Sequence, residues 1–295
     1  MHEHVETLRR FNRSFTQRIG VLDDSFLGSG RPLGPSRLLF EIGQAAGGVG
    51  VLELRTRLGL DSGYVSRLLR QLESEGLLNI DTDPGDGRRR TAQLTARGRA
   101  VWNDLDRRSA DLAEHIVAPL SPRHREQLST ALAAADRLLR AATVSFDIVD
   151  PRSTDAVFAL TQYFDELDRR FPDGFDPGDA LVADAPMLQA PTGVFVVAHS
   201  TEEPVACGAV TRIDDSTAEI KRMWVAPEWR GVGLGQRMLA HLEGRVRDLG
   251  HSRVVLDTNS TLVEAINMYE RSGYQPVPRY NDNPYALRWF AKALH

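Results

Sequence analysis

One short stretch of the chain combines the residue types that can hold a pyrophosphate. An apolar segment ending at Val225 leads through a proline turn into Arg230-Gly231-Val232-Gly233-Leu234-Gly235, after which a helix is predicted. Glycines leave their backbone N–H groups accessible, and the beginning of a helix adds positive potential. The stretch therefore favours a loop that binds the phosphates of a cofactor.

The spacing of this loop excludes two other phosphate-binding loops. A dinucleotide-binding loop needs a third glycine and an acidic residue roughly 20 positions further on, and a Walker loop needs Gly-Lys-Ser/Thr. The pattern Arg-x-x-Gly-x-Gly at 230–235 instead resembles the acetyl-CoA loop of the GNAT N-acetyltransferase family. Residues 219–225 resemble the central strand of that family. Residues 265–274 resemble its second motif, a helix that ends in glycine and is followed by a strand.

The resemblance implies a transfer of acetyl from acetyl-CoA to an amine. This reaction requires that the amine lose a proton and that the thiolate of CoA gain one. Tyr269 matches the position at which many relatives have a general acid, and a tyrosine buried between helix and sheet is the alternative. Glu219 is the candidate general base, acting directly or through a water. A structural carboxylate paired with Lys221 or Arg222 is the alternative for Glu219.

Two further groups are expected to contact acetyl-CoA. A backbone N–H near Val225 can polarise the thioester carbonyl. Relatives often carry an asparagine three residues before the motif-two alanine, but this chain has Leu262 there. Asn259 or Asn267 can take its place, and Asn267 lies two residues before Tyr269, where relatives also have an asparagine.

A second set of polar residues is predicted to contact DNA. Residues 51–60 predict a short helix and a turn at Gly59, and residues 64–75 predict a second helix, which Asp61 or Ser62 can cap. One side of this helix is apolar. The other side and the start of the helix carry the candidate DNA contacts Ser62, Tyr64, Ser66, Arg67 and Arg70. This arrangement is typical of a helix-turn-helix, and a plain helical hairpin with a solvated arginine face is the alternative.

The next segment favours the DNA-binding interpretation. Strands are predicted at 77–81 and 91–94, and the turn between them ends in Arg88, Arg89 and Arg90. Arginine at a hairpin tip can enter the minor groove or pair with phosphate. The segment resembles the wing of the MarR family, on the matching residues Asp86, Arg88, Leu94, Thr95 and Gly98. Gly87 stands where that family frequently has arginine, so which of the three arginines reaches DNA stays open.

The elements predict two domains, at 1–144 and 145–295. The first is α-rich, a winged helix-turn-helix with long helices at 2–19 and 98–142, which the MarR resemblance implies to be dimerisation helices. The resemblance thus implies a homodimer on a palindromic double-stranded operator. The second domain is predicted to be an α/β (α+β) GNAT fold with a mixed, mostly antiparallel sheet. A loop is expected at 172–191, a short strand at 274–278 and a closing strand at 286–291.

The composition limits where in the cell the protein is expected and what it is expected to bind. No run of about 18 apolar residues is present, so no membrane span is expected. The first residues do not resemble a secretory signal. The single cysteine, Cys207, lies in an apolar run and is expected to be a buried thiol, which fits a cytoplasmic protein. The histidines show no metal-ligand spacing, so no metal is expected. The net charge of −4 is divided between a slightly basic first half and an acidic second half.

The resulting hypothesis is a DNA-binding transcriptional regulator fused to an acetyl-CoA-dependent N-acetyltransferase. The acceptor is an amine of a small molecule or of a protein. In one alternative, the second domain senses acetyl-CoA without turnover. In the other, the winged helix only dimerises an enzyme.

Overall fold

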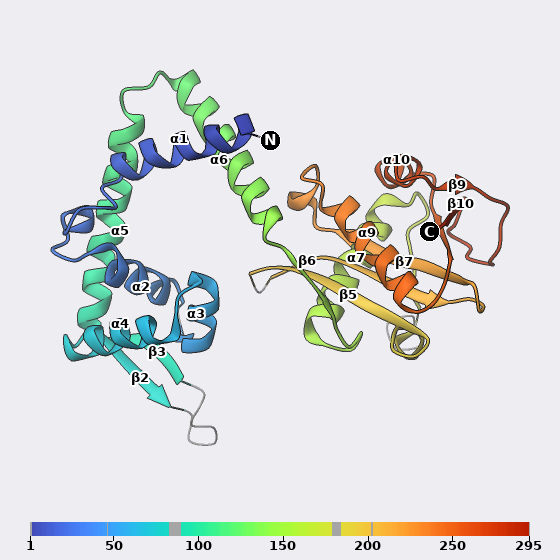
Figure 1. Ribbon diagram of the computed structural model, residues 1–295, viewed down its shortest axis with the longest axis horizontal. Coiled ribbons are helices and arrows are strands. Elements are labelled where there is room, and N and C mark those ends of the chain that lie inside the picture. Colours follow the sequence, from blue (N-terminus) through green and yellow to red (C-terminus); the bar gives the residue numbers. More distant parts are fainter. Residues whose placement is uncertain (1, 46, 83–89, 179–183, 202, 295) are drawn as a thin grey trace. The chain divides into compact units, whose positions relative to one another are not determined.

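The chain is divided into two compact units, Met1–Leu128 and Ser129–His295, which are described separately. The computed structural model describes residues 2–45, 47–82, 90–178, 184–201 and 203–294 (Figure 1). The division lies within helix α6 (Pro122–Ala142). The domain boundary predicted after residue 144 lies just beyond the end of that helix.

The first unit is helical with one small sheet. Its elements are α1 (His2–Arg18), η1 (Phe26–Gly28), α2 (Leu33–Gln44), β1 (Val49–Gly50), α3 (Val51–Leu58), α4 (Ser62–Ser74), β2 (Leu78–Thr82), β3 (Arg90–Leu94) and α5 (Ala96–Val117). The antiparallel sheet has the order β1-β3-β2, and the β2–β3 hairpin lies beside α4 (Figure 1). This confirms the predicted winged helix-turn-helix fold.

Local capping explains where α5 begins. The Thr95 hydroxyl accepts a hydrogen bond from the Gly98 N–H at 2.9 Å and donates one to the Gly76 carbonyl at 2.7 Å. A Cβ atom on Gly98 would lie 2.0 Å from the Leu77 carbonyl oxygen, so only glycine lets the helix approach the strand this closely. These two residues therefore join the wing to the long helix.

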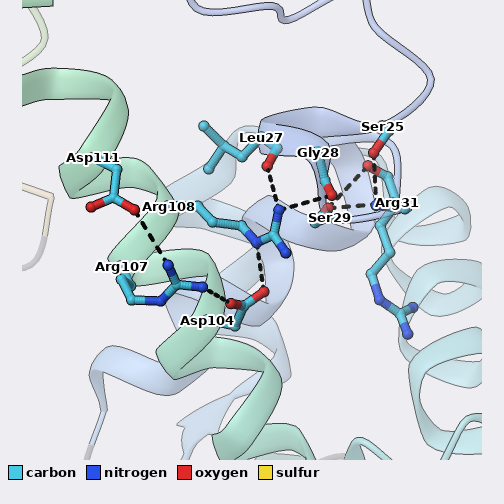
Figure 2. Close-up of polar contacts among 10 residues, drawn as sticks. Ser25, Leu27, Gly28, Ser29, Arg31, Asp104, Arg107, Arg108 and Asp111 are labelled. Carbon is cyan, nitrogen blue, oxygen red and sulfur yellow. Dashed lines mark hydrogen bonds and ion pairs between the residues drawn. The ribbon is translucent and has the colours of Figure 1, made fainter. Parts of the chain in front are cut away.

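A polar cluster joins the connection between α1 and α2 to α5. Figure 2 shows Arg108 donating to the carbonyl oxygens of Leu27, at 3.3 Å, and Gly28, at 3.0 Å. The same guanidinium donates to Asp104 at 2.6 Å, and Asp104 also accepts from Arg107. The hydrogen bonds of Arg108 thus fasten the short turn η1 to α5.

The long helices leave much apolar surface exposed. None of the described residues of α1 is buried, and Gly98 and Leu105 are the buried residues of α5. The exposed apolar side chains on α1 and α6 are Val5, Leu8, Phe11, Phe15, Leu132, Leu138 and Leu139. Apolar side chains exposed in this number are typical of an interaction site.

The second unit is a seven-stranded mixed sheet covered by helices. Its elements are β4 (Ser145–Ile148), α7 (Thr154–Arg170), η2 (Ala185–Leu188), β5 (Gly193–Ser200), β6 (Glu203–Arg212), β7 (Thr217–Val225), η3 (Pro227–Trp229), α9 (Leu234–Asp248), β8 (Arg253–Thr258), α10 (Val263–Arg271), β9 (Gln275–Pro276) and β10 (Arg288–Ala293). The sheet order is β4-β5-β6-β7-β8-β10-β9. Only the β7–β8 pair is parallel among the described strands, which confirms the predicted mostly antiparallel sheet.

Several details differ from the sequence-based expectation or sharpen it. The strand expected at 274–278 is only two residues long. The strand expected at 286–291 is β10, which lies between β8 and β9. Cys207 is buried as predicted, and burial raises the pKa of its thiol to about 12. Among the described residues, no helix is both long and apolar enough to span a membrane.

Candidate functional site

The two parallel strands of the second unit separate along their length. β7 pairs with β8 only from Thr217 to Glu219, although it continues to Val225. A bulge lies in the part of β7 beyond this pairing, because Cys207 and Ala209 of β6 face β7 residues that are three apart. At this bulge Arg222 has a φ of 55°, a conformation that L-residues rarely adopt. The separation leaves an opening between β7 and β8.

A cavity of about 660 Å³ lies at this opening. Its walls come from α7, the end of β7, the loop before α9, and α10. The lining residues are Tyr163, Glu166, Leu167, Arg170, Met223, Trp224, Val225, Arg230, Gly231, Gly233, Gly235, Gln236, Leu262, Glu264, Ala265, Met268, Tyr269 and Arg271. The volume is within the range of small-molecule and cofactor sites.

The loop before α9 has the geometry of an anion site. Gly231 has a φ of 77° and Gly233 a φ of 80°, and no atom lies within 4 Å of the position that a Cβ would take at either glycine. Gly233 is the N-terminal cap of the 15-residue helix α9, whose first N–H groups have no partners within the helix. The backbone at 231–235 therefore presents N–H groups and a positive helix end to the cavity, which fits a pyrophosphate.

Arg230 closes this loop against the end of β7. Its guanidinium donates to the Val225 carbonyl from Nε at 3.0 Å and from Nη2 at 2.8 Å, and it forms an ion pair with Glu166. Glu166 also accepts from the Trp224 indole at 3.2 Å and from Arg170 at 3.3 Å. In the structure, Arg230 thus positions the loop rather than standing free for a ligand.

The predicted cofactor contacts fall into two groups. Val225, Arg230, Gly231, Gly233, Gly235 and Tyr269 line the cavity. Leu234 is buried in the core and Val232 packs against it, and neither is among the lining residues. Asn267 is exposed on α10 and is not among the lining residues, and the Asn259 amide donates to the Tyr285 carbonyl at 2.8 Å.

Two tyrosines stand where the first cavity meets a second. Tyr269 and Tyr163 line both cavities, and no hydrogen bond to either hydroxyl is formed by the described residues. Burial raises the pKa of both hydroxyls well above the usual value, so both are protonated donors at neutral pH. Tyr163 was not predicted from the sequence, because nothing in the spacing of α7 indicates that it faces α10.

Glu219 is held by a set of donors. Its carboxylate accepts from the Tyr280 hydroxyl at 2.9 Å and from the Asn281 amide at 3.2 Å, and it pairs with Lys221 at 3.0 Å. It is buried and lines neither cavity. The pairing with Lys221 matches the structural alternative, and any action as a base would have to pass through a water.

The second cavity, of about 330 Å³, combines a carboxylate with aromatic rings. Asp257 on β8 accepts from the amides of Asn281, at 2.5 Å, and Asn283, at 3.1 Å. Burial raises the pKa of Asp257 above its ordinary value, the Asn281 amide opposes this, and the charge of Glu219 adds to it. Asp257 was not predicted as a site residue, because its hydrogen-bond partners lie in a loop more than 20 residues away in the chain.

The helix-turn-helix surface is built on α4. Asp61 caps this helix by accepting from the N–H groups of Gly63, at 2.9 Å, and Tyr64, at 3.1 Å. Val65, Leu68, Leu69 and Leu72 are buried beneath it. Among the predicted DNA contacts, Ser62, Tyr64, Arg67 and Arg70 are exposed, Ser66 is half-buried, and Arg90 is half-buried at the start of β3. Arg88 and Arg89 lie outside the described residues.

Comparison with known proteins identifies both halves. The model of the acetyltransferase (GNAT) family matches residues 160–274, and that of the MarR family matches residues 37–89. The IAA acetyltransferase of Azospirillum brasilense is 31% identical over 133 residues, which cover 44% of this chain and 87% of that protein. An uncharacterized N-acetyltransferase of Schizosaccharomyces pombe is 35% identical over 98 residues, which cover 32% of this chain and 59% of that protein.

Solved structures resemble each half separately. A GNAT family acetyltransferase from Elizabethkingia anophelis with acetyl-CoA bound is 16% identical, with a TM-score of 0.39, and covers 51% of this chain and 98% of that chain. A MarR family transcriptional regulator from Rhodococcus sp. RHA1 is 19% identical, with a TM-score of 0.38, and covers 46% of this chain and 94% of that chain.

Proposed function

Because the chain belongs to the GNAT acetyltransferase family and contains a MarR-family winged-helix domain, we propose that it is a DNA-binding transcriptional regulator that also acetylates an amine. The main support for the proposed acetyltransferase activity is the opening between β7 and β8. There the glycine loop, the end of β7 at Val225 and the Tyr269 hydroxyl surround one cavity. These are the groups that acetyl transfer from acetyl-CoA needs.

Each group has a task in this reaction. The backbone N–H groups of residues 231–235 bind the pyrophosphate of acetyl-CoA. Asn267 on α10 does not line the cavity, so its expected contact is with a part of the cofactor that extends beyond the cavity. A backbone N–H near Val225 holds the thioester carbonyl oxygen. Tyr269 donates a proton to the departing thiolate. The proton of the amine goes to a carboxylate beside the opening, for which Glu219 is the candidate from the sequence and Asp257 the candidate from the structure.

The test of this activity is acetyl-CoA turnover against a panel of amines and peptides, followed as thiol release and as acetylated product. Turnover with an amine supports the enzyme. Tight acetyl-CoA binding without any turnover would favour the alternative in which the second unit senses acetyl-CoA.

The DNA-binding half is supported by the exposed polar face of α4, with Tyr64, Arg67 and Arg70 above a buried apolar face. Exposed apolar side chains on α1 and α6 support a homodimer, because a second copy would bury them. We propose that the dimer binds a palindromic operator in the cytoplasm, with half-sites about one helical turn apart.

Footprinting on the DNA that flanks the protein's own gene, with an unbiased selection of sites, tests the operator. Sedimentation tests the dimer. A folded dimer that selects no palindrome would favour the alternative in which the winged helix only dimerises an enzyme.

A further inference from the structure

We propose that Asp257 binds the ammonium group of the acceptor and removes its proton, while the aromatic wall of the second cavity selects a small amine with an apolar or aromatic body. This inference rests on the proposed acetyl transfer and names the acceptor class and the base for it. It follows from the partners of Asp257, from the walls of the cavity and from its connection to the acetyl-CoA cavity.

Asp257 differs from the other carboxylates that line the second cavity. Asp184 forms an ion pair with Arg222, and Asp176 is exposed and caps a turn by accepting from the Gly178 N–H. The described residues give Asp257 two neutral amides as hydrogen-bond partners and no ion pair. A partly buried carboxylate without a cation is costly, so the site favours a cation supplied by a ligand.

The two cations that line this cavity, Lys221 and Arg222, are already engaged in ion pairs. Lys221 influences the charge of Asp257, but its ammonium group pairs with Glu219 at 3.0 Å. Asn281 bridges the two carboxylates, because its amide donates to Glu219 at 3.2 Å and to Asp257 at 2.5 Å. Glu219 thus acts as a positioning residue, and Asp257 is the carboxylate that reaches the cavity.

The rest of the cavity wall is aromatic. Phe175 packs on Tyr285 with ring centroids 4.6 Å apart and on Phe164 at 5.6 Å. Asn283 links this wall to the carboxylate, because it donates to Asp257 and accepts from the Tyr285 N–H at 3.1 Å. One end of the cavity therefore suits a cation and the other an apolar body. The volume of about 330 Å³ matches a small molecule.

The two cavities share the surfaces that the reaction needs. Tyr163, Tyr269 and Met223 line both, and the charge of Asp257 contributes to the raised pKa of both tyrosine hydroxyls. An amine held by Asp257 is thus adjacent to the place proposed for the thioester.

The proposed step conserves atoms and charge. The carboxylate of Asp257 takes one proton from the ammonium group, and the freed lone pair attacks the thioester carbonyl carbon. A C–N bond forms and the C–S bond breaks. The thiolate receives a proton from Tyr269, and the nitrogen loses its second proton to restore the tyrosine. Asp257 then releases its proton to solvent, leaving an N-acetyl amine and CoA thiol.

The main experiment measures kcat/KM for phenethylamine, 1,4-diaminobutane and a lysine-containing peptide. Phenethylamine should be the best acceptor of the parent protein. Asp257→Asn should lower its kcat/KM by about 10²–10⁴-fold without changing the affinity for acetyl-CoA. Asp282→Asn is the matched control, since it removes the same charge from an exposed position between Asn281 and Asn283 and should behave like the parent.

The pH dependence separates a base from a structural carboxylate. The raised pKa of Asp257 means that kcat/KM should fall as the pH decreases through that value, because a protonated carboxyl cannot accept a proton. The difference in kcat/KM between the parent and Asp257→Asn should become smaller as the pH rises toward the pKa of the amine, where free amine is abundant. The substitution leaves the other titratable and charged groups around Asp257 in place. Glu219, Lys221, Tyr163, Tyr269 and Tyr280 interact with its charge, and Asp176, Asp184, Arg222 and Tyr285 line the same cavity.

A binding measurement on the parent protein avoids any effect of substitution on folding. With CoA bound, phenethylamine should bind at least about tenfold more tightly than 2-phenylethanol, which has the same ring and no charge. Equal binding of the two would overturn the role of Asp257.

The remaining outcomes are distinct. An Asp257→Asn enzyme within threefold of the parent overturns the base, and a preference for the peptide or the diamine overturns the acceptor class. No turnover by the parent with any amine overturns the proposed enzymatic function, and this inference with it.

Discussion

Replacing Gly233 with aspartate tests the phosphate-binding loop most directly. Gly233 has a φ of 80°, and the space around a Cβ there is open, so the new side chain has room while the backbone is strained by roughly 1–2 kcal/mol. The carboxylate would stand at the beginning of α9. At about 5 Å from a phosphate charge, with an effective dielectric constant of about 20, the repulsion is about 3 kcal/mol. This corresponds to about 10²-fold weaker binding of acetyl-CoA.

The matched control is Gly233→Asn, which has the same shape, tolerates a positive φ and carries no charge. Calorimetric titration with acetyl-CoA of the parent and both variants separates the effects, because the ratio of the two variant affinities contains only the charge. Thermal unfolding shows whether each variant is folded. Equal affinities of the asparagine and aspartate variants would refute the placement of a phosphate at this loop.

The remaining predictions concern the acid, the operator and the wing. Tyr269→Phe should lower turnover by roughly 10²–10⁴-fold at unchanged acetyl-CoA affinity. Steady-state kinetics of this variant and of Tyr163→Phe identify the proton donor, because removal of the donor hydroxyl causes the larger decrease in turnover. Arg67→Ala should relax the preference at particular bases and cost about 1–3 kcal/mol of operator binding, whereas equal weakening on all sequences would mean a phosphate contact. Gly98→Ala should destabilise the first unit by roughly 1–3 kcal/mol, because its Cβ would lie 2.0 Å from the Leu77 carbonyl oxygen, and an unchanged denaturant midpoint would contradict this.

Short-range patterns in the sequence predict most of the elements of the fold. Asp61 caps α4 as the sequence predicts, and α5, capped by Thr95, and α9, preceded by Gly233, begin within about two residues of the predicted starts. Hydrogen bonds between residues two to four apart determine these positions, so the spacing of a few residues is sufficient to find them. The apolar run around Cys207 likewise predicted a buried thiol, and residues 219–225, which resemble the central strand of the GNAT family, lie in β7.

The sequence by itself thus determined the two domain types, the winged helix-turn-helix face and the glycine loop, because each is encoded by neighbouring residues. Only the tertiary structure decided which groups surround the opening between β7 and β8. It brought Tyr163 from α7 beside Tyr269, and it brought Asn281 and Asn283 from a loop onto Asp257. The residues that meet there come from segments far apart in the chain, and such contacts depend on sheet order and loop path, which no local spacing records.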